Sequence, residues 1–84
     1  MLDQESNITH IIGKRVRAVR KRHKLSQDAL ANRCIPPLNS NYIGEIERGE
    51  KSVTADRLRR IAIVLGVSLD YLVAMPNSED DADV

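Results

Sequence analysis

Apolar residues recur three and four positions apart along most of the chain, which is the spacing of one face of an α-helix. The first such stretch runs from about Ile8 to His23, and its apolar residues are Ile8, Ile11, Ile12, Val16 and Val19. Shorter stretches with helical spacing occupy residues 27–34, 39–49, 55–65 and 69–73. No stretch alternates convincingly with the period of two that strands show. The pattern therefore predicts an all-α fold of five short helices joined by tight turns.

Polar residues mark the ends of these helices. Serine, threonine or asparagine stands where each helix is expected to begin, and the predicted caps are Ser6 or Asn7, Ser26, Asn39, Thr54 and Ser68. Gly49 and Gly66 supply the left-handed residue that ends a helix, and Pro36–Pro37 stops the second helix.

The segment 39–49 combines a narrow apolar edge with an amide-rich front end. Ile43 and Ile46 are three residues apart, so both can point into one core. The other faces carry side chains that form hydrogen bonds: Ser40, Asn41, Tyr42 and Glu45. A short helix of this kind suits the recognition of base edges in the major groove. The alternative interpretation is a surface helix whose polar face is only solvated.

The composition allows one domain with a small aliphatic core. The 84 residues include two Tyr and neither Phe nor Trp. Cys34 is the only cysteine, which excludes an internal disulfide and a usual Cys-based zinc site, and we interpret it as a small buried hydrophobe. No apolar run approaches the roughly 20 residues that span a bilayer. The acidic N-terminus does not resemble a signal peptide, so we expect a cytoplasmic location.

The net charge of +1 hides an uneven distribution. Residues 14–24 hold seven Lys or Arg and no acid, whereas residues 79–83 hold four acids and no base. Blocks of this kind suggest an interaction surface plus a disordered extension, and the alternative for the basic block is a solvated helix face. Along the whole chain we expect a flexible N-terminus at 1–7, one folded domain at 8–75 and an acidic disordered tail at 76–84.

Most of the basic residues are expected on the outer sides of the first helix, namely Lys14, Arg15, Arg17, Lys21 and Arg22. Arg20 differs from them because it follows Val16 by four residues and lies beside the apolar stripe. A long side chain at this place is expected to reach inward and pair with a carboxylate.

Four segments between residues 12 and 72 carry a resemblance: IGKRVR at 12–17, LSQDALA at 25–31, YIGEIERG at 42–49 and LRRIAIVLGV at 58–67. Together, in this order, they resemble the helix-turn-helix repressors of the phage Cro and repressor type, also called the Xre family. The resemblance implies a compact five-helix domain that binds double-stranded DNA as a two-fold dimer and regulates transcription. The run at 41–50 also looks like the controller proteins of restriction–modification systems, although antitoxins, plasmid regulators and phage repressors share this scaffold.

The resemblance places the base-reading side chains at the front of the third helix: Asn39, Ser40, Asn41, Tyr42 and Glu45. Asn41 suits a bidentate contact with adenine, and Glu45 can accept from the cytosine N4 amino group. For Tyr42, packing of the ring along the helix surface is an equal alternative. The expected phosphate-binding residues are Gln27, Arg48, Lys51, Ser52 and Arg57.

Two further roles follow from the resemblance. Arg20 and Glu47 are expected to form an internal ion pair. The dimer interface is expected in the last helix and the end of the fourth, with the residues Val64, Val67, Leu69, Tyr71, Val73 and Met75. The alternative for these residues is the core of the monomer, to which Leu69 and Leu72 are the strongest candidates. One departure from the family concerns residues 33–38, a connector about two residues longer and without glycine, which is expected to shift how the third helix docks.

An enzyme is not expected, because the sequence has no nucleophile–base pair, metal cluster or phosphate-cradling glycine loop. His10 and His23 are most simply surface residues. The expected partners are a palindromic DNA operator and a second copy of the chain, with no cofactor, small-molecule ligand or membrane. The rival interpretation is an antitoxin or adaptor module that uses the same fold chiefly for protein binding.

Overall fold

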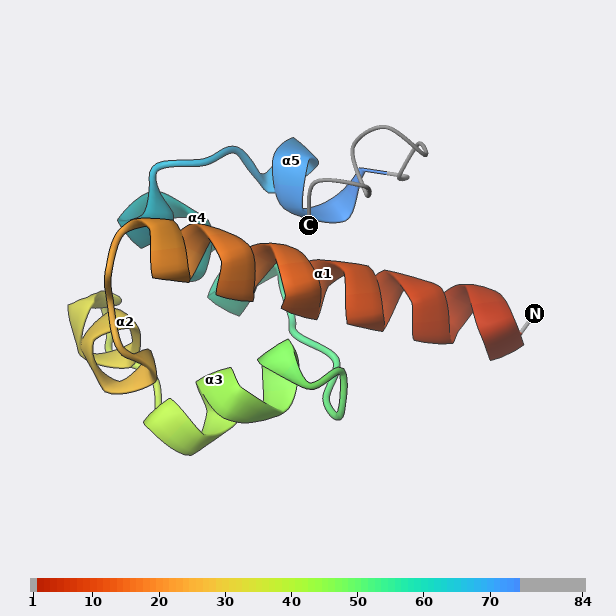
Figure 1. Ribbon diagram of the computed structural model, residues 1–84, viewed down its shortest axis with the longest axis horizontal. Coiled ribbons are helices and arrows are strands. Elements are labelled where there is room, and N and C mark those ends of the chain that lie inside the picture. The colour runs from red at the N-terminus through yellow and green to blue at the C-terminus, as the bar shows by residue number, and fades with distance from the viewer. Residues whose placement is uncertain (1, 75–84) are drawn as a thin grey trace.

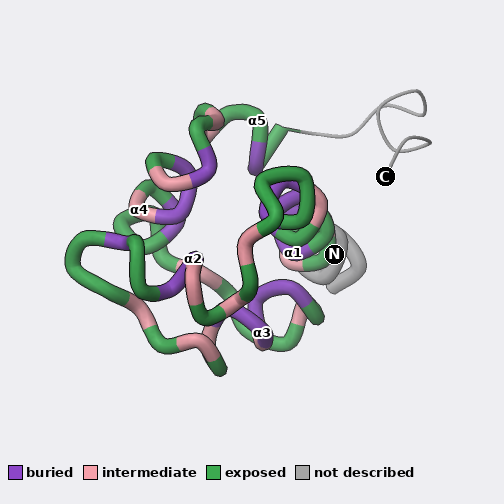
Figure 2. Tube along the Cα trace, turned by 60° about the vertical axis from the view of Figure 1, so that its left-hand side comes forward, coloured by how far each residue is buried: buried purple, intermediate pink, exposed green. Residues whose placement is uncertain are grey.

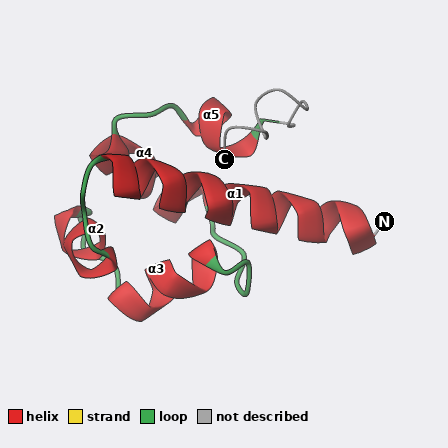
Figure 3. Cartoon of the chain, in the orientation of Figure 1, coloured by secondary structure: helices red, strands yellow, loops and turns green. Residues whose placement is uncertain are grey.

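The computed structural model describes the backbone of residues 2–74 and the side chains of residues 8–74. Within this range it has five helices and no strand, as the hydrophobic pattern predicts. The helices are α1 (Leu2–Arg22), α2 (Gln27–Arg33), α3 (Ser40–Glu47), α4 (Ala55–Leu65) and α5 (Leu69–Val73). α1 runs along the molecule between α3 on one side and α5 on the other, while α2 lies beyond its C-terminal end (Figure 1). Figure 3 shows the loops that connect these helices.

The core is aliphatic and draws on all five helices. Its buried apolar residues are Ile12, Val16, Val19, Leu30, Ala31, Cys34, Ile43, Ile46, Leu58, Ile61, Ala62, Leu65 and Leu72. The buried parts of α1, α3 and α4 turn toward one another (Figure 2). Burial of this continuous apolar surface supplies most of the free energy that holds such short helices together.

The predicted caps of α2 to α5 and the predicted ends of α2, α3 and α4 are confirmed. The side chains of Ser26, Asn39, Thr54 and Ser68 each accept a hydrogen bond from a backbone N–H in the first turn of the helix that follows. Gly49 and Gly66 have φ angles of 75° and 71°, in the left-handed region that an L-residue adopts only with strain. Side-chain chemistry close in sequence thus determines where these helices begin and end.

Three details of α1 differ from the prediction. The helix begins at Leu2 and not at Ile8, so residues 2–7 continue it. Ile8 is 43% exposed and borders a hollow of about 110 Å³ beside Val53. Arg15, expected on the outer side, is only 5% exposed.

Met75 and the acidic tail at 76–84 lie outside the described residues, so the tail remains a prediction. No described helix is both long and apolar enough to cross a bilayer.

Candidate nucleic-acid interface

α3 presents a polar face to the surface because its two isoleucines anchor the opposite face. Ile43 and Ile46 are almost fully buried, whereas Asn41 is exposed and Ser40 and Glu45 are half-buried. Three predicted base-reading residues are therefore accessible on one short helix. Asn39 lies directly before it, and its side-chain oxygen accepts from the backbone N of Asn41 at 2.7 Å. Because the side-chain oxygen of Asn39 caps the helix, its amide nitrogen is the polar group that remains free for another contact.

Tyr42 does not project from α3 as the other polar residues do. Its ring packs against the core, and the Arg57 guanidinium carbon lies 5.2 Å from the ring centroid. The Tyr42 hydroxyl donates a long hydrogen bond of 3.5 Å to the Ser52 carbonyl. The Tyr42 ring therefore packs along the helix surface, which is the alternative considered for it. Through Tyr42, Arg57 and Ser52 are held beside α3.

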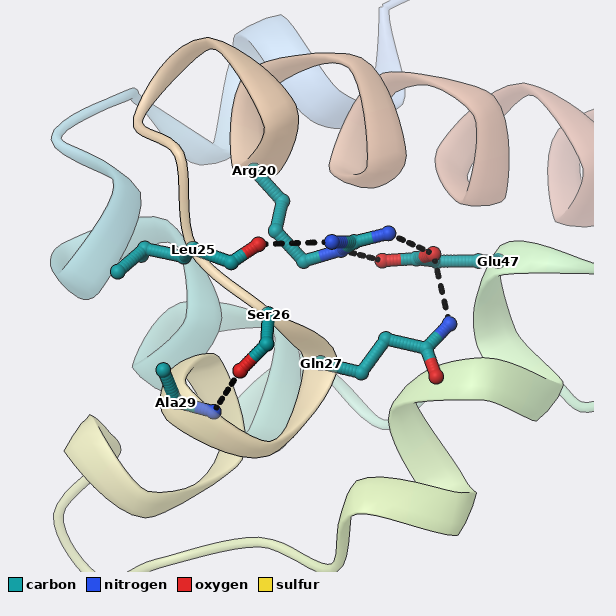
Figure 4. Close-up of polar contacts among 6 residues, drawn as sticks. All are labelled: Arg20, Leu25, Ser26, Gln27, Ala29 and Glu47. Carbon is teal, nitrogen blue, oxygen red and sulfur yellow. Dashed lines mark hydrogen bonds and ion pairs between the residues drawn. The ribbon is translucent and has the colours of Figure 1, made fainter.

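Glu47 and Arg20 form the expected internal ion pair. Arg20 Nε donates to Glu47 Oε2 at 2.6 Å and Arg20 Nη2 donates to Glu47 Oε1 at 3.0 Å, with side-chain exposures of 10% and 2%. Arg20 Nη1 also donates to the Leu25 carbonyl at 2.7 Å (Figure 4). The described part of the chain leaves no buried side-chain nitrogen or oxygen without a hydrogen bond, so this pair is desolvated but satisfied. It joins α1, the connector before α2 and the end of α3.

Gln27 belongs to the same network. Its amide nitrogen donates to Glu47 Oε1 at 3.1 Å, which leaves one amide N–H for another acceptor (Figure 4). Gly44 leaves room for the Gln27 side chain to lie across α3. A Cβ at Gly44 would crowd it, since it would lie 3.3 Å from Gln27 Oε1 and 3.1 Å from Arg48 Nη1. Two of the predicted phosphate-binding residues therefore meet over one glycine.

The predicted phosphate-binding cations surround the loop after α3, and two of them have carboxylate neighbours. Arg48 donates to both Glu50 carboxylate oxygens, at 2.9 and 3.1 Å, and Lys51 Nζ lies 3.8 Å from Glu45 Oε1. Pairing raises the pKa of Arg48 and lowers the pKa of Glu50, so both stay charged at neutral pH. These contacts are largely exposed, and exposed ion pairs contribute little, so a phosphate can replace the carboxylates at small cost.

The longer connector between α2 and α3 is tied back to the fold. The backbone N of Leu38 donates to the Ala31 carbonyl at 3.0 Å. Arg60 of α4 donates to the Pro36 carbonyl at 3.3 Å and to Asp56 at 2.6 Å. Sequence reasoning missed Arg60, because nothing local links it to Pro36. A hollow of about 320 Å³ beside the connector is lined by Pro37, Leu38, Asn39, Tyr42, Arg57 and Arg60.

The predicted dimer residues divide into two groups. Val64, Val67 and Leu69 are half-buried and pack against the core, as the alternative interpretation allows. Tyr71 and Val73 are 38% and 41% exposed. Ile63, which the sequence analysis did not include, is an exposed apolar residue on α4. Met75 lies outside the described residues.

Cys34 and His23 each contact a backbone carbonyl group. Burial raises the pKa of the Cys34 thiol, which donates to the Leu30 carbonyl at 3.4 Å. His23 Nε2 lies 2.7 Å from the Leu65 carbonyl oxygen, so this histidine is engaged with α4. The residues described contain no group of three or more His, Cys, Asp or Glu that could hold a metal.

Comparison with known proteins points in one direction. A family model described as helix-turn-helix matches residues 16–72. The control protein C.BamHI of Bacillus amyloliquefaciens is 38% identical over 63 residues, which cover 74% of this chain and 75% of that protein. The control protein C.SmaI of Serratia marcescens is 37% identical over 67 residues, covering 80% of this chain and 77% of that protein.

Two more distant similarities extend over most of the chain. The immunity repressor protein of Bacillus phage phi105 is 29% identical over 83 residues, covering 87% of this chain and 56% of the repressor. The crystal structure of a hypothetical transcription factor, NHTF, from Neisseria superposes with a TM-score of 0.78 at 24% identity. The match covers 95% of this chain and 88% of that one, and at this identity it shows a shared fold.

Proposed function

The chain belongs to the helix-turn-helix family of the Cro and repressor type, and from this premise we propose that it binds a palindromic DNA operator as a two-fold dimer. Its relatives are control and repressor proteins, so the chain is a DNA-binding regulator of transcription and not an enzyme. The resemblance inferred from its sequence motifs is thereby confirmed. The cytoplasmic location and the role of a restriction–modification controller are part of the proposal.

The observation that carries the proposal is the combination of an accessible polar face on α3 with an amide donor against its side and cations after its end. α3 is eight residues long, and its buried isoleucines direct Asn41 and Glu45 away from the core. Gln27 lies against one side of the helix, and Arg48 and Lys51 follow its end. A helix that enters the major groove needs this arrangement, because base edges lie between two strands of phosphates.

Each accessible group then has a role. Asn41 donates to and accepts from adenine, and Glu45 accepts from cytosine N4, after its contact with Lys51 opens. Ser40 and the free amide of Asn39 supply further hydrogen bonds to base edges. The Tyr42 ring lies beside the Arg57 guanidinium, and its hydroxyl is bonded to the Ser52 carbonyl. Tyr42 therefore contributes to DNA binding through its ring and not through a free hydroxyl.

The phosphates are bound on both sides of α3. The second amide N–H of Gln27 and the guanidinium of Arg48, which meet over Gly44, serve one strand, and Lys51, Ser52 and Arg57 serve the other. Each phosphate contact that a cation makes steepens the salt dependence of log affinity by roughly one unit. Dimerisation through Tyr71, Val73 and the neighbouring apolar residues brings two α3 helices to successive major grooves.

Selection of bound duplexes from a random DNA pool tests the proposal. The expected product is an inverted repeat whose half-sites lie about one helical turn apart, bound with strong salt dependence in a gel shift. Absence of any preference among duplexes at moderate ionic strength would reject the proposal. Purification with a stoichiometric second protein, together with that result, would favour the antitoxin or adaptor module.

Asn41→Ala is expected to weaken operator binding without affecting folding. Asn41 is exposed, and its backbone N–H remains capped by Asn39, so the thermal unfolding midpoint should stay unchanged. Loss of a bidentate base contact corresponds to about 1–3 kcal/mol, or roughly a fivefold to 150-fold loss of affinity. Binding constants on the selected operator and on variants at each position measure the effect. Equal losses on every sequence would assign Asn41 to the phosphates and not to a base.

A further inference from the structure

Arg15 is a buried arginine that has no carboxylate partner among the described residues. It is 5% exposed, within a stretch whose other basic residues are mostly at the surface. Arg15 Nη1 donates to the carbonyl oxygens of Tyr71 and Ala74, each at 2.8 Å, and its guanidinium carbon lies 5.7 Å from the Tyr71 ring centroid. These carbonyls belong to the C-terminal end of α5, where unpaired oxygens and the helix dipole favour a cation.

α5 depends on such contacts because it is only five residues long, and a helix of this length is unstable alone. Ser68 caps its start, Leu72 inserts into the core, and Arg15 holds its end. Tyr71 and Val73 lie between these attachments and remain partly exposed. Arg15 is therefore the attachment that joins these two side chains directly to α1 through hydrogen bonds.

The same turn of α1 contacts α3. Gly13 lies two residues before Arg15, and a Cβ there would overlap the carbonyl oxygen of Ile46 and lie 2.8 Å from that of Glu47. The α1 and α3 backbones thus touch at Gly13, while α5 is held at Arg15. One turn of α1 thus contacts both α3 and α5, and Figure 1 shows α1 lying between these two helices.

We infer that Arg15 is a positioning residue that determines which spacing between operator half-sites the dimer accepts. The inference rests on the proposed function. In a two-fold dimer, the separation of the two α3 helices equals the separation of the half-sites that they contact. When Arg15 holds α5 against α1, this separation has one value. When the bonds from Arg15 are removed, α5 shifts on α1, and several separations become accessible.

The test uses Arg15→Met, which keeps an apolar stem of similar length and removes the donors. Lys21→Met is the matched control, because it removes one positive charge from an exposed site of the same helix. The duplexes are the selected operator, versions with one or two base pairs added or removed between the half-sites, and a single half-site. For the wild type, a change of one base pair should reduce affinity about tenfold. For Arg15→Met the same change should reduce it less than about threefold, while affinity for the single half-site matches that of Lys21→Met.

Several outcomes would overturn the inference. A wild-type spacing profile in Arg15→Met would show that α5 does not need this residue. An equal loss of affinity for the single half-site and for the full operator would show that Arg15→Met has a general structural effect. Circular dichroism establishes whether Arg15→Met is folded. If Arg15→Met does not fold, Arg15→Lys takes its place in the test. Arg15→Lys keeps the charge and one donor group, so it should give an intermediate profile, and a wild-type profile would again contradict the inference.

Failure of the proposed function is recognised separately. If the wild type selects no duplex, the proposed function is rejected, and sedimentation equilibrium then tests Arg15 alone. Arg15→Met should dissociate into monomers with a constant at least about tenfold larger than that of the wild type. Equal constants would overturn the role of Arg15. A wild type that is monomeric at high micromolar concentration would overturn both proposals.

Discussion

Glu47→Ala is expected to lower the free energy of unfolding by about 3–5 kcal/mol, the usual effect of removing one partner from a buried ion pair. The Arg20 guanidinium would remain in the core without the carboxylate that accepts from its Nε and Nη2. Gln27 would lose its acceptor as well. Chemical denaturation measures the change. Any loss of operator affinity should follow from unfolding and disappear at a temperature where the variant is folded.

Two comparisons make this expectation specific to the buried pair. Glu50→Ala removes the carboxylate of the exposed pair with Arg48 and should leave the unfolding midpoint nearly unchanged. The double variant Arg20→Met, Glu47→Leu replaces both charges with apolar side chains and should recover much of the stability that Glu47→Ala loses. If Glu47→Ala keeps its melting temperature but loses DNA binding, Glu47 acts at the DNA and the assignment to an internal pair is wrong.

The features that sequence analysis predicted correctly depend on local chemistry. Helical spacing gave the five helices, and capping side chains gave the starts of α2 to α5, because each cap acts within three residues of itself. The Arg20–Glu47 contact joins residues 27 apart, and it was predicted because the family resemblance supplied the partner. The arginine's place beside the apolar stripe indicated only that it points inward.

The features that were missed depend on the packing of distant segments. Helical spacing put Arg15 on the polar side of α1, but α5 covers that side and offers carbonyl groups, so the arginine is buried. Helical spacing also put Ile8 on the apolar side of α1, but this side chain borders an open hollow and is 43% exposed. Arg60 and Pro36 are 24 residues apart, and only the arrangement of α4 against the connector brings them together. A helical face can thus be predicted from sequence, whereas the segment that covers it cannot.

Gly13→Ala is expected to destabilise the fold by about 3 kcal/mol, at the upper end of the range for overpacking. The new Cβ would overlap the Ile46 carbonyl oxygen and press on that of Glu47. Backbone atoms cannot rotate away, so α1 and α3 must separate, and the gain of about 1 kcal/mol in helix propensity offsets only part of the cost. Thermal and chemical unfolding measure the loss. Operator affinity should also fall, because α3 moves relative to Gln27 and the rest of the interface.

Gly44→Ala is the matched comparison, because Gly44 is also a buried glycine within a helix. The nearest atoms to its added Cβ are the ends of the Arg48 and Gln27 side chains, which can move aside. Its stability should therefore stay the same or rise through helix propensity, while phosphate binding by the two displaced side chains weakens. The two variants therefore separate an effect on folding stability, expected at Gly13, from an effect on DNA contact, expected at Gly44. Should Gly13→Ala raise the melting temperature as Gly44→Ala does, the α1 and α3 backbones do not touch at this turn. Arg15 would then have no fixed connection to α3 through which to position the dimer.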